Sequence, residues 1–231
     1  ADMAKPSSSA AALETIHNRH AERAAQMQRY MKSQMPYSGV AMPEVRAIGK
    51  RLLAGLDVSR FDDWEREVLA LWSGARVREE RYVALALCGH RAAREHQTLR
   101  ALPLYERLIV EGAWWDFVDE LAAHRLGEIL RREGAPMKRA MKTWSRCDNL
   151  WKRRSSIICQ LRFKADTDLA LLFACIEPSL DSKEFFLRKA IGWALRAHAD
   201  VDADPIRRYV HANEARLSPL SRREALRKVG L

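Results

Sequence analysis

The chain has 231 residues, of which 48% are hydrophobic and 30% are charged, an ordinary balance for a globular protein with a sizeable core. An excess of 40 Lys and Arg over 30 Asp and Glu gives a formal net charge of +10. This excess favours a polyanionic partner such as nucleic acid, with a basic surface that serves only solubility as the alternative. No long apolar run lies beside a compact basic cluster, so we expect no membrane partner.

Residues 1–10, ADMAKPSSSA, are small and polar and predict a disordered leader. No signal-peptide pattern opens the chain, and the four cysteines include no C-x-x-C pair; both features favour a reducing, cytoplasmic location. His17 and His20 share a helical face, but no further ligand completes a metal site. We therefore expect neither metal nor cofactor, and interpret the cysteines as small buried hydrophobes: Cys88, Cys147, Cys159 and Cys175.

From Ala11 onward, apolar residues recur at three- and four-residue spacing, and strand-like alternation is absent. Gly and Pro interrupt this pattern at intervals typical of helices of ordinary length, for example at Pro43, Gly112 and Pro178. The pattern predicts an all-α fold, with one domain over residues 11–231.

Four segments of similar character follow one another at spacings of roughly 35 residues: 80–85, 115–121, 151–158 and 187–191. Such a period is typical of stacked antiparallel helix pairs, so we expect an α-solenoid of HEAT-like repeats. Equivalent helices of a solenoid line one concave surface. The polar residues of that helix series are mostly cationic, which predicts a basic groove around a single carboxylate: Arg81, Asp119, Arg153, Arg154, Arg188, Lys189 and Arg196.

The segment Gly112–Glu120 reads GAWWDFVDE and places two tryptophans beside two aspartates. With a helix start at Gly112–Ala113, Asp116 falls in the first turn, where its carboxylate meets unpaired N–H groups. Asp119 lies beyond that turn and shares a helix face with Trp115, four residues earlier. On spacing alone, Asp119 paired with a nearby arginine and Trp115 in the core is the structural alternative to a functional site.

The segment Asn149–Ser156 combines three successive cations, Lys152, Arg153 and Arg154, with hydroxyl groups at a predicted helix start. Free N–H groups and cationic side chains suit phosphate oxygens, although a solvated charged turn has the same composition.

The segment Phe185–Arg196 carries a second group of cations, and Arg188 or Lys189 together with Arg196 could bind a nucleic-acid backbone. Trp193 in this segment is either a core residue or an exposed flat face. No G-x-x-x-x-G-K-[ST], G-x-G-x-x-G, H-E-x-x-H or G-x-S-x-G motif occurs, so nucleotide hydrolysis, dinucleotide binding, zinc proteolysis and α/β-hydrolase chemistry lack their usual motifs.

Four blocks of the sequence together resemble the AlkD-type DNA alkylation repair family of HEAT-like repeat DNA glycosylases. They are YMKSQMPYSGV (30–40), WWDFVDELA (114–122), LWKRRSSIICQL (150–161) and FFLRKAIGWALR (185–196). Their order and spacing agree with the family, and the likeness extends from about residue 13 to the C-terminus.

The resemblance implies a base-excision-repair hydrolase that removes cationic N3- and N7-alkylated purines from double-stranded DNA by cleaving the N-glycosidic bond. By motif, Asp119 matches the catalytic carboxylate, and Trp115 and Trp193 match the aromatic pair beside the sugar of the lesion. Arg154 matches a phosphate contact, Arg196 a further backbone contact, and Tyr30 a tyrosine that approaches DNA. The wider set of expected DNA contacts is Arg154, Tyr30, Arg196, Lys152, Arg153, Arg188 and Lys189.

The segment Met35–Ser38 departs from the more aromatic and apolar segment of the family, and this departure bears on substrate range. No lysine lies in the expected slot, so we expect a monofunctional enzyme without a lyase step, acting as a monomer. Two alternatives remain at this stage. One is a noncatalytic HEAT-repeat protein that recognises distorted or branched DNA, and the other is a protein-interaction scaffold.

Overall fold

The structure is a computed structural model that describes residues 20–229; the predicted leader at residues 1–10 and His17 lie outside this range. Within it, thirteen α-helices and several short 3-10 or π segments account for all regular structure, and no strand occurs. The all-α fold is therefore confirmed. The chain divides into two compact units between His96 and Gln97, and the expectation of one domain over residues 11–231 stays a prediction.

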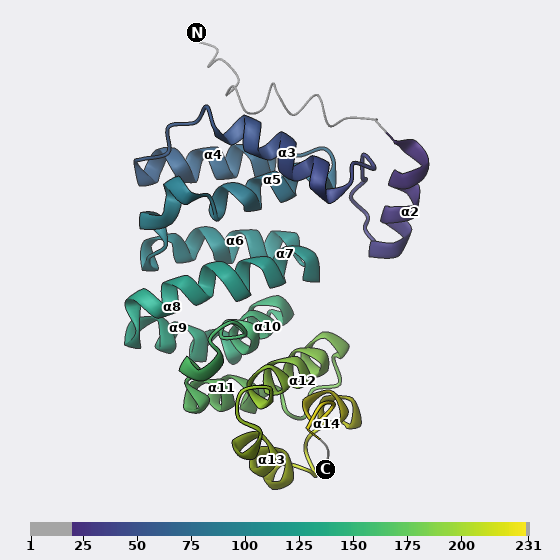
Figure 1. Cartoon of the computed structure of the whole chain (residues 1–231), viewed down its shortest axis with the longest axis vertical. Helices are drawn as coiled ribbons and strands as arrows, with labels where there is room; N and C mark the ends of the chain where they lie inside the picture. The colour runs from purple at the N-terminus through teal and green to yellow at the C-terminus, as the bar shows by residue number, and fades with distance from the viewer. Residues whose placement is uncertain (1–19, 230–231) are drawn as a thin grey trace. The chain divides into compact units, whose positions relative to one another are not determined.

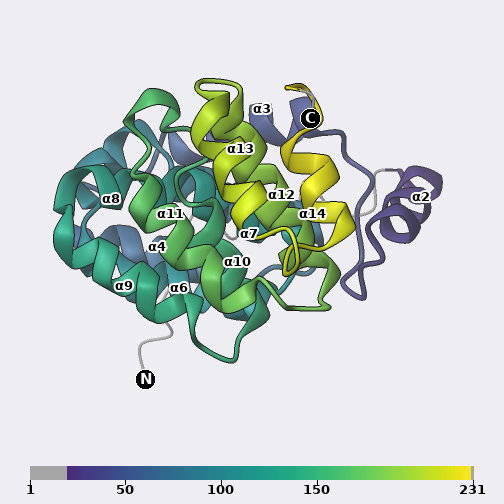
Figure 2. The same ribbon diagram turned by 90° about the horizontal axis from the view of Figure 1, so that it is seen from below.

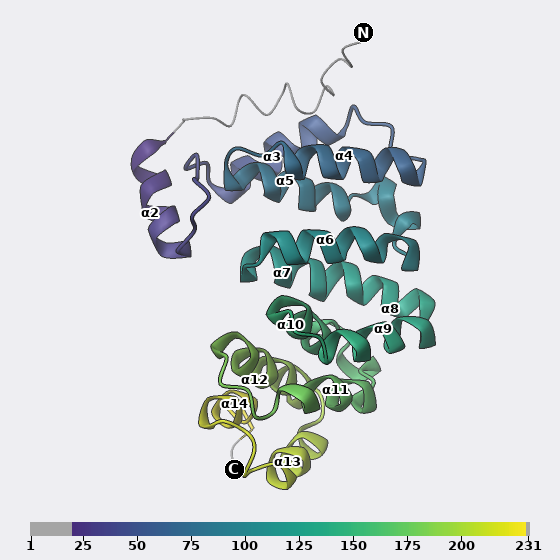
Figure 3. The same ribbon diagram turned by 180° about the vertical axis from the view of Figure 1, so that it is seen from behind.

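The first unit contains four α-helices and one 3-10 helix: α2 (Ala21–Met31), α3 (Met42–Leu53), α4 (Phe61–Ser73), α5 (Arg78–Cys88) and η2 (Arg91–His96). Helix α5 packs against both α3 and α4 (Figures 1 and 3). Trp64 and Trp72 of α4 are fully buried, and the indole of Trp64 donates a hydrogen bond to the carbonyl of Leu87 at 3.1 Å. Pro43 lies in the first turn of α3, where the sequence predicts a helix start.

A buried carboxylate fixes the loop between α2 and α3. Both oxygens of Glu79 on α5 accept the backbone N–H of Ser38, and one also accepts that of Gly39, at 2.9–3.1 Å. Gly39 has a φ of 86°, a conformation that favours glycine. The segment Met35–Ser38, which departs from the family pattern, is therefore anchored at its end by a charged group in the core.

The second unit holds the remaining helices: η3 (Leu99–Ala101), α6 (Leu102–Gly112), α7 (Trp115–Glu120), η4 (Leu121–Leu126), α8 (Gly127–Glu133), α9 (Ala135–Ser145), α10 (Leu150–Ile158), η5 (Lys164–Asp166), α11 (Leu169–Ile176), η6 (Glu177–Ser179), α12 (Phe185–Ala199), α13 (Ala203–Ala212) and α14 (Pro219–Ala225). Helix α10 packs against α6, α7, α9 and α12. Helix α12 also contacts α13 and α14, as Figure 2 shows.

Several side-chain contacts within this unit share one sequence separation, although others span 28 to 46 residues. Four ion pairs link residues 35 positions apart: Asp119 with Arg154, Arg131 with Asp166, Asp181 with Arg216, and Lys189 with Glu224. A constant separation is expected when successive repeats stack in register. The period predicted from the sequence therefore recurs in the packing of this unit.

Gly192 lies where α12 meets α14. A Cβ at this position would lie 2.5 Å from the Cβ of Glu224 and 3.2–3.3 Å from backbone atoms of Ser221. We expect Gly192→Ala to lower the free energy of unfolding by about 1–3 kcal/mol, because overpacking outweighs the gain in helix propensity of about 1 kcal/mol. Urea denaturation of the variant measures this change.

Gly49→Ala is the matched control, because Gly49 is also a buried glycine within a helix. A Cβ there would meet only side-chain atoms of Val83, at 3.8 Å. This variant should be stabilised by about 1 kcal/mol through helix propensity. Stabilisation of both variants would show that α14 does not pack closely enough against Gly192 to exclude a Cβ.

Candidate functional site

The segment GAWWDFVDE spans the junction between two helices. Helix α6 ends at Gly112, Ala113 follows with a φ of 45°, and Trp114 is the extended residue before α7. The helix that carries the aspartates thus begins at Trp115, slightly later than the predicted start at Gly112–Ala113, because Ala113 adopts the left-handed conformation that terminates α6. Asp116 lies in the first turn, and its Oδ1 accepts the N–H of Phe117 at 3.0 Å, which confirms its role at the helix start.

Helices α7 and α8 form one continuous helix that is interrupted by the π-helical segment Leu121–Leu126. This segment begins two residues after Asp119. Insertions of π geometry into α-helices are frequent at functional sites. The sequence did not predict this feature, since its apolar spacing is compatible with an uninterrupted helix.

Asp119 and Arg154 form a bidentate ion pair that joins α7 to α10. Nε of Arg154 donates to Oδ1 of Asp119 at 2.8 Å, and Nη2 donates to Oδ2 at 2.9 Å. Nη1 of the same guanidinium donates to the carbonyl of Phe186 at 2.6 Å. The Arg154 side chain is only 6% exposed and that of Asp119 17% exposed, so the arginine is enclosed while the carboxylate still reaches the surface.

Two opposing influences act on the Asp119 carboxyl. Burial raises its pKa and is the larger influence, whereas the hydrogen bonds and charge of Arg154 lower it; the nearby charge of Asp116 raises it further. The net result is a pKa above the ordinary value of an aspartate. The bidentate contact from the guanidinium favours the ionised form, which is the form able to stabilise a neighbouring cation.

The two adjacent tryptophans have different environments. Trp114 packs edge-on against Trp151 and Phe186, with ring centroids 5.9 and 5.2 Å apart. Trp115 is 37% exposed on the face of α7 that it shares with Asp119. Trp115 is therefore not the core residue that the structural alternative required.

Trp193 of α12 lies on the other side of Arg154, and the guanidinium carbon is 5.9 Å from the indole centroid. Its side chain is half-buried, so it is neither a fully enclosed core residue nor a free surface residue. The structure thus brings Asp119, Arg154 and Trp193 together from three helices.

The start of α10 is capped within the protein. The side chain of Asn149 accepts the N–H groups of Trp151 and Lys152, each at 3.0 Å. The hydroxyls of Ser155 and Ser156 donate to backbone carbonyls within the helix. Two of the N–H groups and both hydroxyls therefore already have protein partners, because the helix is capped by Asn149. Phosphate binding by this segment stays a prediction, with a charged turn as the alternative.

Three of the cations expected to contact DNA have protein partners. Lys152 pairs with Glu106 at 2.8 Å. Arg153 donates to the carbonyl of Pro178 and the hydroxyl of Ser179, both at 2.9 Å, and Arg188 donates to the carbonyl of Ser182 at 2.9 Å. These contacts tie helices and loops together, and DNA binding by these three residues stays a prediction.

Lys189 and Arg196 share one partner, Glu224 of α14, at 3.2 and 2.8 Å. The hydrogen bond from Lys189, followed by the charges of Lys189, Arg196 and Arg227, holds the pKa of Glu224 below its ordinary value. Sequence analysis did not identify Glu224. The absence of a side chain at Gly192 lets Glu224 lie close to α12 and reach both cations.

Tyr30 belongs to the first unit and is 80% exposed on α2. It lines an apolar pocket of about 360 Å³ whose other lining residues are Gln26, Met27, Met31, Tyr37, Met42 and Tyr82. The hydroxyls of Tyr37 and Tyr82 are joined by a hydrogen bond of 2.8 Å. Tyr37 belongs to the departing segment Met35–Ser38, so this segment forms part of the surface next to Tyr30.

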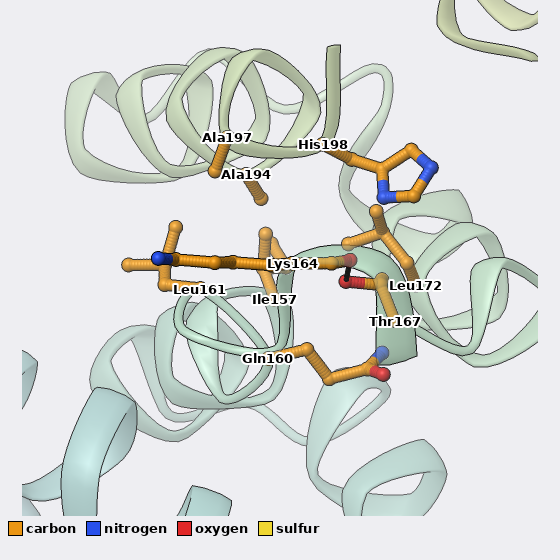
Figure 4. A pocket seen from close by; sticks show the side chains of 9 residues that line it. All are labelled: Ile157, Gln160, Leu161, Lys164, Thr167, Leu172, Ala194, Ala197 and His198. Carbon is orange, nitrogen blue, oxygen red and sulfur yellow. Dashed lines mark hydrogen bonds between the residues drawn. The ribbon is translucent and has the colours of Figure 1, made fainter. Parts of the chain in front are cut away.

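A pocket beside α12 does not qualify as a ligand site. It is lined by residues that include Gln160, Thr167 and His198, and its volume of about 10 Å³ accommodates one water molecule at most (Figure 4). The amide of Gln160 is already satisfied by both backbone groups of Asp168. This pocket therefore belongs to the structural core.

The cysteines show little sign of reactivity. Cys88, Cys159 and Cys175 are buried, as expected, whereas Cys147 is half-buried. Burial raises the pKa of Cys175 to about 12 and also raises that of Cys159, so both remain thiols at neutral pH. Within residues 20–229, no group of three His, Cys, Asp or Glu side chains is placed to hold a metal ion, and no helix is long and apolar enough to cross a membrane.

Comparison with known proteins supports the resemblance found in the four motif blocks. Residues 11–229 match the family model described as DNA alkylation repair enzyme. The chain is also similar to a solved structure described as a predicted DNA alkylation repair enzyme from Enterococcus faecalis, with 28% sequence identity and a TM-score of 0.81 over 92% of this chain and 97% of that chain. A search of curated proteins finds no match. The chain therefore belongs to the DNA alkylation repair enzyme family.

Proposed function

We propose that the chain is a monofunctional DNA glycosylase that hydrolyses the N-glycosidic bond of cationic N3- and N7-alkylated purines in duplex DNA. Family membership supports a role in DNA repair with DNA as the substrate. The observation that carries this proposal is the Asp119 carboxylate, which reaches the surface while Arg154 holds both of its oxygens. Trp115 shares a helix face with Asp119, and the indole centroid of Trp193 lies 5.9 Å from the guanidinium carbon of Arg154.

The chemistry requires no acid to protonate the departing base. An alkylated purine carries a positive charge, so the electron pair of the broken C1′–N bond neutralises the base as it leaves. Positive charge then develops on the deoxyribose, and the Asp119 carboxylate stabilises it. Water attacks C1′, and its proton passes to the carboxylate. The faces of Trp115 and Trp193 add cation–π stabilisation to the sugar cation.

Arg154 acts on this chemistry through Asp119. A guanidinium that fills both carboxylate oxygens fixes their direction and opposes the rise in pKa that burial causes. Its third contact, to the carbonyl of Phe186, fixes the arginine itself. We propose that Arg154 is a positioning residue; the phosphate contact that the family resemblance implies stays a prediction, because all three guanidinium nitrogens already bind protein oxygens.

The reaction type predicts a sharp distinction between cationic and neutral lesions. The protein should release 7-methylguanine and 3-methyladenine from methylated duplex DNA, because both bases leave as neutral molecules. It should not release O6-methylguanine or uracil, because these bases carry no positive charge and would have to leave as anions. Chromatography of the released bases measures this selectivity.

Equal release of neutral and cationic bases would contradict the proposed mechanism. Tight, salt-dependent DNA binding without release of any base would instead favour a noncatalytic DNA-binding protein. The ion pair between Asp119 and Arg154 is compatible with that second function, because it also joins α7 to α10 as a structural link.

A further inference from the structure

A cationic pocket lies beside Trp193, at the C-terminal end of the second unit. It has a volume of about 440 Å³ and is lined by Trp193, Arg196, Ala197, Asp200, Arg227 and Lys228. The first four residues belong to α12 or its end, and the last two follow α14. The pocket thus forms where two segments about thirty residues apart in sequence meet.

Three cationic side chains and one carboxylate line this pocket. Lys228 pairs with Asp200 at 3.3 Å across its mouth, with both side chains partly exposed. Arg196 is held by Glu224 at 2.8 Å. Arg227 is exposed, and its positive charge contributes to the lowered pKa of Glu224. An exposed guanidinium is a group that binds anions such as phosphate.

The pocket adjoins the candidate active site through one side chain. Trp193 lines the pocket and also lies 5.9 Å from the guanidinium carbon of Arg154, which binds Asp119. A nucleotide whose sugar lies between Trp193 and Asp119 carries phosphates on both sides of that sugar. Either phosphate is an anion of the kind that the three cationic side chains of the pocket can bind.

We propose that this pocket is a subsite for a DNA phosphodiester next to the lesion, with Arg227 as its principal contact and Lys228 as a second contact that Asp200 restrains. This proposal rests on the proposed function in one respect, namely that the sugar of the lesion lies between Trp193 and Asp119. Guanidinium groups bind phosphate oxygens through paired hydrogen bonds, which a lysine cannot reproduce. When DNA binds, Lys228 leaves its ion pair with Asp200 and binds the phosphate instead.

The test measures binding of the full chain to an undamaged DNA duplex by fluorescence anisotropy over a series of NaCl concentrations. Arg227→Gln should weaken binding by about tenfold and reduce the slope of log K against log salt by about one unit, as expected for one lost phosphate contact. Arg222→Gln is the matched control, because Arg222 also lies on the α14 segment but pairs with Glu214 away from the pocket. It removes the same charge and should leave the slope unchanged.

We expect Asp200→Asn to change the affinity for DNA in the opposite direction. Loss of this carboxylate frees Lys228, so the variant should bind the duplex about two- to fivefold more tightly. A purely structural role of the pair between Asp200 and Lys228 predicts no gain. Inorganic phosphate added at millimolar concentration should compete weakly with DNA in the wild type and not in Arg227→Gln.

Equal losses of affinity in Arg227→Gln and Arg222→Gln would overturn the proposal, since they would reflect net charge alone. Unchanged binding in Arg227→Gln, or phosphate binding that depends on Arg227 while DNA binding does not, would also overturn it. These measurements use undamaged DNA and need no base release. A failure of the glycosylase assignment is therefore separable from a failure of this subsite.

Discussion

Asp119→Asn should lower the single-turnover rate of 7-methylguanine release by about 10²–10³-fold, equivalent to about 2.7–4 kcal/mol of transition-state stabilisation. The variant keeps the size of the side chain and one oxygen for Arg154, but it loses the negative charge that the sugar cation requires. The dissociation constant for duplex DNA should change little. A quench-flow or manual time course with excess protein over a duplex carrying one 7-methylguanine measures the rate.

Asp116→Asn is the matched control on the same helix. Asp116 lies in the first turn of α7 and accepts the N–H of Phe117, and an asparagine can make the same contact. Its rate should stay within about threefold of the wild type, since asparagine remains a good residue for the first turn. A large loss of rate in Asp116→Asn with little loss in Asp119→Asn would contradict the account, because it would assign the chemistry to Asp116.

Arg154→Gln should have the second largest effect, on both stability and pH dependence. Removal of one partner from a buried ion pair leaves the other charge without compensation and costs about 3–5 kcal/mol of unfolding free energy. Arg154 is the buried partner, and it also anchors the carbonyl of Phe186. Urea denaturation measures the loss. Arg154→Lys should recover part of the stability but not the bidentate geometry.

The sign of the pH effect follows from the Asp119 carboxyl. Burial raises its pKa, and Arg154 lowers it. Since the ionised carboxylate is required, the rate falls as pH drops through this pKa. Loss of Arg154 removes the lowering influence, so the acidic limb of the single-turnover rate should move to higher pH in Arg154→Gln.

Arg125→Gln controls for the loss of a partly buried arginine in the same unit. Arg125 pairs with Glu128 at 3.2 Å and has no contact with Asp119. The acidic limb of the pH–rate profile of Arg125→Gln should coincide with that of the wild type. If the limb moves equally in both variants, or moves to lower pH in Arg154→Gln, Arg154 does not control the ionisation of Asp119.

The sequence predicted those features of the site that follow from helical spacing and from the repeat period. Helical spacing placed Trp115 and Asp119 on one face, and the repeat of roughly 35 residues relates Asp119 to Arg154, which are in contact. Spacing alone could not decide between a structural ion pair and a functional carboxylate, because both require the same contact. The family motifs favoured the functional interpretation.

Other features depend on contacts that no local pattern encodes. Glu224 and Glu106 bind groups on other helices, and Glu79 binds the loop between α2 and α3, so a single sequence does not reveal those partners. Asn149 is part of a predicted phosphate site, and its side chain caps α10. The fold brings Arg227, which follows α14, to the same pocket as Trp193, and no pattern in the sequence predicts this proximity.

The division of the chain at His96 and Gln97 was also not visible in the sequence, because apolar helical spacing continues across it without a Gly- or Pro-rich linker. Tyr30 and the segment Met35–Ser38 lie in the first unit, and Asp119 and Trp193 lie in the second. Participation of Tyr30 in DNA binding therefore stays a prediction from the family motif. The basic groove expected from the repeats stays a prediction for the same reason.

The central claim is that this protein hydrolyses a glycosidic bond by means of Asp119. Mass spectrometry of a duplex with one 7-methylguanine, incubated with excess wild-type protein, tests it most directly. The account predicts free 7-methylguanine and an abasic site in an unbroken strand, with almost no conversion by Asp119→Asn in the same time. A duplex that is fully bound by the wild type and keeps its alkylated base attached would contradict the claim.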